Sequence, residues 1–199
     1  MRILAIETSG SACSVALIEG DQIIAERHEI VGRGHAERLI PWIAALPNGG
    51  RADHIIVGCG PGSFTGVRIG VAAARGLGIG WGVPVHGVSS LALIAAECEE
   101  PAFTVAVEGG HGEVFVQHFT REPLSASAEV QSLTPINAAA RSNDVIYGSG
   151  AIRVTEHIGN SNAEDRAARA ANIRFLATDM LRLPPRPIYG RGADATPMP

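Results

Sequence analysis

Residues 59–70, CGPGSFTGVRIG, combine the residue types of a phosphate-binding loop. Gly60 and Gly62, with a proline between them, allow backbone conformations that suit a sharp turn. Ser63 or Thr65 supplies a hydroxyl oxygen that can cap the first N–H groups of a following helix. Such a helix start attracts anions. Two interpretations are open, a phosphate cradle or a tight strand-to-helix turn that packs a helix close to a sheet.

The composition excludes several function classes. All 16 basic side chains are arginine, so the chain has no lysine for a Walker loop, a Schiff base or a lysine general base. A net charge of −4 argues against a general nucleic-acid binder. The three cysteines form neither a CxxC pair nor a disulfide framework. We predict a cytoplasmic protein without a signal segment or a membrane span.

Strand and helix patterns recur in both halves of the chain. In the first half, strands are predicted at 2–7, 12–18, 22–30, 54–59 and 84–87, and helices at 36–46, 65–80 and 89–97. In the second half, strands are predicted at 103–108, 113–119, 128–132 and 144–148, and helices at 135–141 and 163–183. This order predicts an α/β protein with two duplicated lobes. Residues 1–99 form the first lobe, and residues 100–199 form a shortened second lobe with a C-terminal helix and tail.

Several segments resemble the bacterial TsaB (YeaZ) family, a partner subunit in tRNA threonylcarbamoyladenosine synthesis. The loop GPGSFTGVRIG is similar to the family signature. Further similar segments are RILAIETSGSACSVALI, HAERLIPWI, GVPVHGVSSLALIA, GHGEVFVQHF and RPIYGRGADATP. Together they span most of residues 1–119 and the last dozen residues. The resemblance implies a two-lobe actin-like ATPase (ASKHA) fold with RNase H-like lobes.

The resemblance also implies a division of labour with the paralogue TsaD, which carries a metal and the catalytic site. The TsaD segment matching VSSLALI carries two metal-binding histidines, and these positions here hold Ser90 and Ile94. Neither side chain replaces imidazole on iron or zinc. Glu7 and Glu108 stand where the family has aspartate, and Gly110 where it has a basic residue, which argues against nucleotide chemistry. We predict no catalytic residue, metal or cofactor in this chain, with ATP and metal on partner subunits.

Arg68 and Arg75 lie seven residues apart, hence on nearly the same face of the predicted helix. Packing within the lobe is one explanation for this face. The family resemblance instead implies a subunit interface through the helices at 36–46 and 65–80. In that interpretation the two arginines pair with acids or carbonyls across the interface. Three further residues would give apolar contact: Leu39, Ile43 and Val71.

Two other sets of residues have structural and functional explanations. Six arginines occur between residues 166 and 191 against one acid, Asp179, which suits either a solvated helix face or contact with the tRNA backbone. None of the seven histidines forms an i, i+4 pair on a predicted helix, so we expect structural or solvent roles for them.

The sequence and the resemblance together predict a non-catalytic subunit that binds TsaD and the ATPase TsaE. It would support transfer of the threonylcarbamoyl group to adenosine in tRNA, touch tRNA through the complex, and form a homodimer when alone. The alternatives are an independent ASKHA-type nucleotide-binding phosphotransferase and a free-standing homodimeric regulator.

Overall fold

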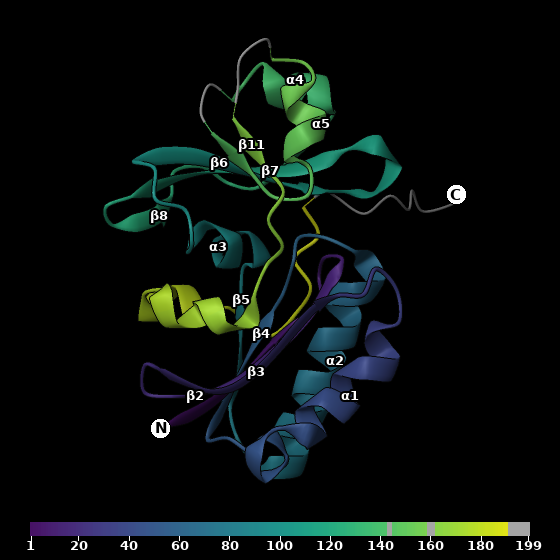
Figure 1. Cartoon of the computed structure of the whole chain (residues 1–199), viewed down its shortest axis with the longest axis vertical. Helices are drawn as coiled ribbons and strands as arrows, with labels where there is room; N and C mark the ends of the chain where they lie inside the picture. Colours follow the sequence, from purple (N-terminus) through teal and green to yellow (C-terminus); the bar gives the residue numbers. More distant parts are fainter. Residues whose placement is uncertain (143–144, 159–161, 191–199) are drawn as a thin grey trace, which may run out of the picture.

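The first lobe is built on a five-stranded sheet with the strand order β3-β2-β1-β4-β5 (Figure 1). The computed structural model describes residues 1–142, 145–158 and 162–190. The strands are β1 (Arg2–Glu7), β2 (Ala12–Glu19), β3 (Gln22–Ile30), β4 (His54–Gly58) and β5 (Val85–Val88). β1 pairs antiparallel with β2 and parallel with β4, and β5 is parallel to β4.

The second lobe repeats this connectivity on a second sheet, with the order β11-β10-β6-β7-β8 and β9 beside β7. Its strands are β6 (Ala102–Glu108), β7 (Val114–Arg121), β8 (Leu124–Ala126), β9 (Gln131–Leu133), β10 (Ile146–Tyr147) and β11 (Ala163–Glu164). β6 pairs antiparallel with β7 and parallel with β10, as β1 does with β2 and β4. The structure therefore confirms the predicted duplication.

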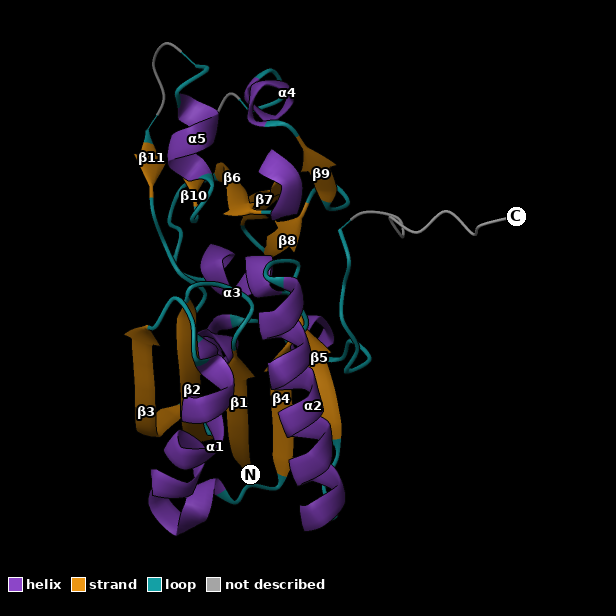
Figure 2. Cartoon of the chain, turned by 90° about the vertical axis from the view of Figure 1, so that its right-hand side faces the viewer, coloured by secondary structure: helices purple, strands orange, loops and turns teal. Residues whose placement is uncertain are grey.

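Helices and sheets alternate in layers along the molecule (Figures 1 and 2). The outer face of the first sheet carries α1 (His35–Ala45) and α2 (Phe64–Trp81). The middle layer holds α3 (Ser90–Ala95) and the 3₁₀ segments η3 (Ala170–Phe175) and η4 (Thr178–Leu181). The outer face of the second sheet carries α4 (Pro135–Ala139) and α5 (Ala151–Thr155). Short 3₁₀ turns, η1 (Pro47–Gly50) and η2 (Gly110–Gly112), complete the elements.

The middle layer joins the two sheets into a common core. Phe103 and Phe119 of the second sheet stack at 5.8 Å and belong to one buried cluster with Ile56 of the first sheet. Leu91 and Leu93 of α3 lie fully buried in the same cluster. Because strands with both faces covered bury successive side chains, β1 and β4 are apolar almost throughout.

The predicted helix over 163–183 is wrong. The segment instead forms β11 and two 3₁₀ segments that return to the first lobe. Arg169 donates to both carboxylate oxygens of Glu26 at 2.7 and 2.9 Å, and the Ala170 amide donates to Ser14 Oγ at 3.0 Å. Asn172 Nδ2 donates to the carbonyl of Leu93 at 2.8 Å. These contacts and the burial of the segment override its helical propensity.

Other differences from the predicted elements are local. The strand expected at 128–132 corresponds to β9, and the structure adds two short elements, β8 and α5, to those expected from the sequence. Position 144 of the strand expected at 144–148 lies outside the described residues, as does the tail from 191 to 199. Within the described ranges, no helix is both long enough and apolar enough to cross a bilayer.

Candidate functional site

The loop after β4 turns sharply before it enters α2. Gly60 has φ 86° and the Gly60–Pro61 bond is cis. The Ser63 amide donates to the carbonyl of Ser9 at 2.6 Å, and Ser63 Oγ accepts from the Gly66 amide at 3.2 Å. Of the two predicted capping residues, Ser63 therefore makes the cap, and α2 begins directly after it.

The β1–β2 turn packs directly against the start of α2. A Cβ atom on Gly62 would collide with the Ser9 carbonyl oxygen, and one on Gly66 with the Thr8 carbonyl oxygen. Thr8 Oγ1 also donates to the Gly66 carbonyl at 2.7 Å. The loop glycines thus permit a close approach of helix and turn, which supports the tight-turn interpretation. Phosphate contact stays a prediction for four residues: Gly60, Gly62, Ser63 and Thr65.

A buried carboxyl group connects this loop to α3. Glu7 ends β1 with only 1% of its surface exposed, and it accepts hydrogen bonds from the Ser9 amide and from Ser90 Oγ, the latter at 2.6 Å. Ser90 Oγ in turn accepts from the Gly60 amide at 3.0 Å. Burial raises the pKa of the Glu7 carboxyl, because the hydrogen bonds offset only part of the desolvation cost.

The two positions that the resemblance matches to metal ligands in TsaD make structural contacts here. The Ser90 hydroxyl is held between Glu7 and the Gly60 amide, and Ile94 is buried in the core between the sheets. Nothing in the described ranges brings together three or more potential metal-ligating side chains. The donor set at this place fits a hydrogen-bonded structural link and does not fit a transition metal.

Arg68 is held by the C-terminal segment. Its Nε and Nη2 donate to Tyr189 Oη at 3.1 and 3.0 Å, and its guanidinium lies 3.6 Å from the centre of the Phe64 ring. The Ile188 amide donates to the carbonyl of Cys59 at 2.8 Å, which fixes this segment beside the loop. Arg68 thus connects α2 to Tyr189 of the C-terminal segment, beside the loop.

Three of the five predicted interface residues are instead core residues. Leu39, Ile43 and Val71 are buried between the first sheet, α1 and α2, because each faces the sheet that its helix covers. They offer no surface to a partner, so their predicted interface role is wrong. Arg68 and Arg75 are exposed.

The outward face of α2 carries small residues and one large apolar side chain. We call this surface the α2 face and define it as Ala72, Arg75, Gly76, Ile79 and Gly80, all exposed. Ile79 is 85% exposed. A Cβ atom on Gly76 or Gly80 would meet no atom within 4 Å. The fold of this chain therefore does not require glycine at either position, although glycine lowers helix stability.

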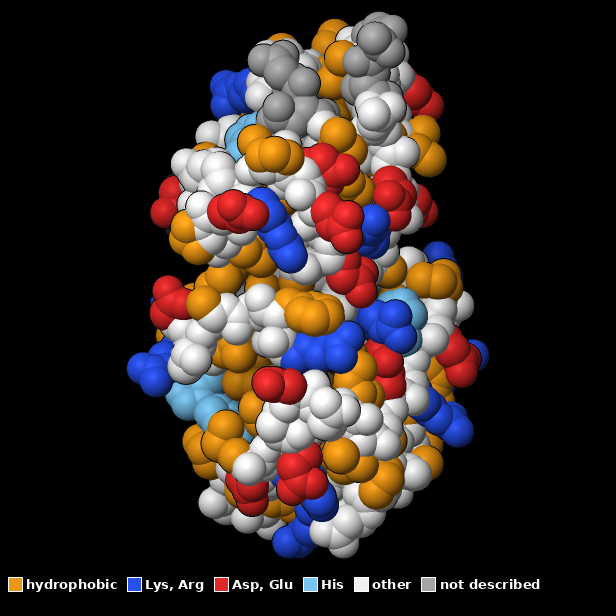
Figure 3. All heavy atoms as spheres, turned by 60° about the vertical axis from the view of Figure 1, so that its left-hand side comes forward, with side chains coloured by type: hydrophobic (Ala, Val, Ile, Leu, Met, Phe, Trp, Pro, Cys, Tyr) orange, Lys and Arg blue, Asp and Glu red, His pale blue; other side chains and the backbone are white. Residues whose placement is uncertain are grey.

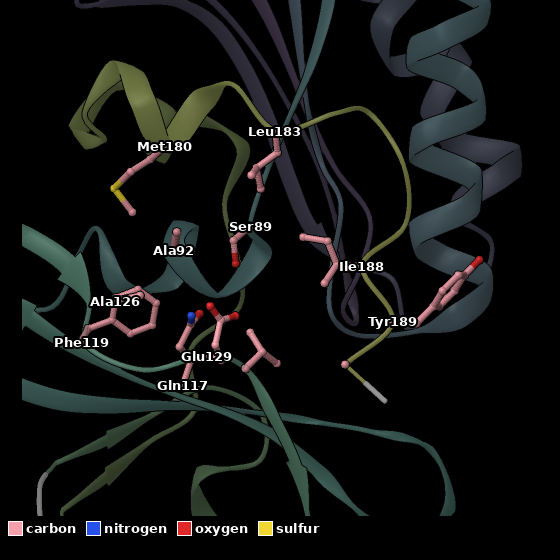
Figure 4. Close-up of a pocket in the computed structure, with 12 residues that line it drawn as sticks. Ser89, Ala92, Gln117, Phe119, Ala126, Glu129, Met180, Leu183, Ile188 and Tyr189 are labelled. Atoms are coloured by element: carbon pink, nitrogen blue, oxygen red, sulfur yellow. The ribbon is translucent and has the colours of Figure 1, made fainter. Parts of the chain in front are cut away.

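A cavity of about 610 Å³ lies between the lobes (Figure 4). Its wall is largely apolar and includes Phe119, Met180 and Leu183, while Ser89 and Glu129 point their oxygens into it. Ser89 Oγ is buried, and no residue in the described ranges forms a hydrogen bond with it. Sequence reasoning did not find this cavity, because its wall comes from α3, β7, the β8–β9 connection and the C-terminal segment.

The second-lobe acid differs from its counterpart in the first lobe. Glu108 is exposed at the end of β6, 3.9 Å from Arg153, and its amide donates to Ser149 Oγ at 3.1 Å. Glu7 is buried. The two strand-end carboxylates therefore occupy different environments despite their matching places in the repeat.

Two of the arginines near the C-terminus form ion pairs with acids of this chain. Arg166 pairs with Glu164 at 2.6 Å, and Arg169 pairs with Glu26. Figure 3 shows acidic and basic side chains intermingled across one face of the molecule. Because the helix expected over 163–183 does not form, the prediction of a solvated helix face is wrong for these residues. Contact with the tRNA backbone stays a prediction, and Arg191 lies outside the described residues.

The repeated lobes, the layered sheets and the loop between β4 and α2 define a two-lobe actin-like protein of the ASKHA class. The YeaZ structure from Pseudomonas aeruginosa superposes with a TM-score of 0.76 at 27% identity, covering 89% of this chain and 91% of that one. The family model for TsaD, tRNA N6-adenosine threonylcarbamoyltransferase, matches residues 22–133, more than half of the chain.

Curated relatives point to one branch of that family. The protein TsaB of Escherichia coli K12, named for tRNA threonylcarbamoyladenosine biosynthesis, is 39% identical over 131 residues, which are 61% of this chain and 56% of that protein. TsaB of Bacillus subtilis 168 is 40% identical over 101 residues, 48% and 44% of the two chains. The chain belongs to the TsaB (YeaZ) family. It spans about half the length of these curated relatives.

Proposed function

We propose that this chain acts in tRNA threonylcarbamoyladenosine biosynthesis as a non-catalytic subunit that binds TsaD and the ATPase TsaE. The observation that carries the proposal is the state of the two positions that match metal ligands in TsaD. Ser90 is bonded to Glu7 and Gly60, and Ile94 is packed in the core. The metal and the transfer chemistry then reside on TsaD, and ATP and TsaE act in the complex.

The α2 face is the surface that we assign to TsaD. Gly76 and Gly80 allow a helix of the partner to approach α2 closely. Exposed Ile79 supplies apolar surface near the C-terminal end of α2. Arg75 is exposed on this face, so its guanidinium can pair with an acid or a carbonyl across the contact. In the absence of TsaD, the same face would join two copies of this chain.

The test of the function is a reconstitution from which one component is omitted. TsaD, TsaE, threonylcarbamoyl-adenylate synthase, unmodified tRNA, threonine, bicarbonate and Mg-ATP are combined with and without this chain, and modified adenosine is measured by mass spectrometry. We expect product only when the chain is present. Equal product in both reactions would overturn the proposal, and tight Mg-ATP binding by the isolated chain would then favour a phosphotransferase.

The test of the surface is an Ile79→Glu variant with Ile152→Glu as its matched control. Both residues are exposed isoleucines on helices, Ile79 on α2 and Ile152 on α5 of the other lobe. Because burying an isoleucine side chain contributes about 1.5–3 kcal/mol, Ile79→Glu should weaken TsaD binding at least about tenfold in calorimetry. Equal affinities for the two variants would place TsaD on another surface.

A further inference from the structure

Two histidines meet on the inner face of the first sheet. His54 begins β4 and His86 lies in β5, the parallel neighbour at the edge of the sheet. His86 is opposite Ile56, so its ring and that of His54, two residues before Ile56, project from the same face. Both rings are half-buried. No i, i+4 spacing predicts this pair, because the sheet brings together residues 32 positions apart in the chain.

The two rings contact each other through nitrogen atoms. His54 Nε2 lies 2.6 Å from His86 Nδ1, and the ring centroids are 4.7 Å apart at 46°. This contact holds one proton, carried by either ring. Burial and the neighbouring His86 lower the pKa of His54, which favours the neutral form of the His54 ring. In the described parts of the chain, neither ring forms an ion pair with a carboxylate.

We infer that His54 and His86 form a two-imidazole site for a divalent transition metal of the Zn²⁺, Ni²⁺ or Cu²⁺ type. Neutral imidazole nitrogen is a preferred ligand of these ions. Two nitrogens bound at about 2.0–2.1 Å in tetrahedral geometry are about 3.3 Å apart. The two rings therefore need to separate by about 0.7 Å, a small side-chain rotation, to admit the ion between them. Water fills the remaining coordination positions.

The proton balance of binding follows from the contact. Each neutral imidazole carries one N–H, and the ion replaces the proton shared between Nε2 and Nδ1. That proton moves through solvent to the other nitrogen of the ring that donated it, so the neutral pair releases no net proton. At lower pH each ring also carries a second proton, which the ion must displace, and the affinity falls.

This site is separate from the positions that match metal ligands in TsaD. β4 runs from His54 to Gly58, so His54 lies about 13 Å along the strand from the point where the loop toward Ser90 begins, and His86, opposite Ile56, lies about 7 Å from it. The site has two protein ligands, and no described acid or cysteine joins them into a larger cluster. Such an open site exchanges its metal readily, unlike a closed structural zinc site.

The experiment uses the full chain without an affinity tag. Titration calorimetry with Zn²⁺ measures the stoichiometry, and electron paramagnetic resonance with Cu²⁺ counts the bound nitrogens. We expect one ion per chain and a two-nitrogen signal. His54→Gln and His86→Gln should each weaken binding at least about tenfold. His157→Gln, an exposed histidine after α5, is the matched control and should bind as the wild type does.

A measurement on the wild-type chain tests the site even if the histidine variants do not fold. Imidazole NMR signals should shift on addition of Zn²⁺ for two of the seven histidines, assigned to residues 54 and 86, with the other five unchanged. The inference is overturned if the wild type binds no Zn²⁺, if other histidines respond, or if the variants retain full affinity. It does not depend on the proposed complex with TsaD.

Discussion

Substitution of two glycines in α2 by alanine should change stability in opposite directions. Gly66→Ala places a methyl group against the Thr8 carbonyl oxygen, which belongs to the backbone of the β1–β2 turn. Gly76→Ala places the same group in open space on the same helix. Both variants gain about 1 kcal/mol of helix propensity, because alanine is the better helix former.

The two expected stabilities follow from the contacts. Overpacking costs about 1–3 kcal/mol, and here a backbone atom must move. Because the contact is with a backbone oxygen, the cost at position 66 falls in the upper part of that range, at about 2–3 kcal/mol. After subtraction of the propensity gain, Gly66→Ala should lower the free energy of unfolding by about 1–2 kcal/mol. Gly76→Ala should raise it by about 0.5–1 kcal/mol. The variants then differ by about 2 kcal/mol, which is a large fraction of the stability of a small protein.

Urea unfolding followed by circular dichroism measures both values on otherwise identical chains. The slope with urea should be equal in the two variants, so that a shift of the midpoint reports stability alone. If Gly66→Ala is as stable as Gly76→Ala, the close approach of α2 to the turn is not what requires glycine at position 66. That result would refute the steric account of the loop signature.

The remaining predictions concern the buried acid and the C-terminal segment. The folded-state pKa of Glu7 is raised, so the stability of the wild type should fall as pH rises above the ordinary carboxyl value, while Glu7→Gln should lack this component. Urea unfolding of both proteins between pH 4 and 8 measures the difference between their free energies of unfolding. The free energy of unfolding of the wild type should fall relative to that of Glu7→Gln as the pH rises. A difference that does not change with pH would contradict a raised pKa of Glu7. Tyr189→Phe removes both hydrogen bonds from Arg68, which together contribute about 0.5–1 kcal/mol to holding the segment. The Ile188 amide should then exchange with deuterium about 2–5 times faster, and an unchanged rate would show that Arg68 does not hold the segment.

Local sequence patterns were sufficient for the first lobe. The strand at 22–30 has the predicted bounds, and the turn residues before α2 identified Ser63 as one of two candidate caps. Alternating or continuous apolar runs and hydroxyl caps are encoded within a few residues, which explains this agreement. The same patterns show that one face of a helix is buried. They do not show whether that face packs against the chain's own sheet or against another protein. The prediction that Leu39 and Val71 contact a partner is therefore wrong, because both residues pack on the chain's own sheet.

Contacts between distant segments explain what the sequence did not reveal. Glu7 and Ser90 are 83 residues apart, and the two residues of the histidine pair come from separate strands. The segment after residue 163 contains many helix-forming residues, yet Ser14 and Glu26 of the first lobe hold it in another conformation. Such pairings depend on the assembled sheets, and local propensity carries no information about them.

The return of the C-terminal segment to the first lobe limits how the lobes can move. Over residues 1–183 the chain passes between the lobes twice, once from α3 to β6 and again from β11 to η3. Two lobes joined by two connecting segments can rotate about the line through both segments. A rotation about any other axis would stretch one of the segments. The ion pair of Arg169 with Glu26 anchors the second connecting segment at the edge strand β3. We therefore expect opening and closing of the interlobe cavity to follow a single rotation axis.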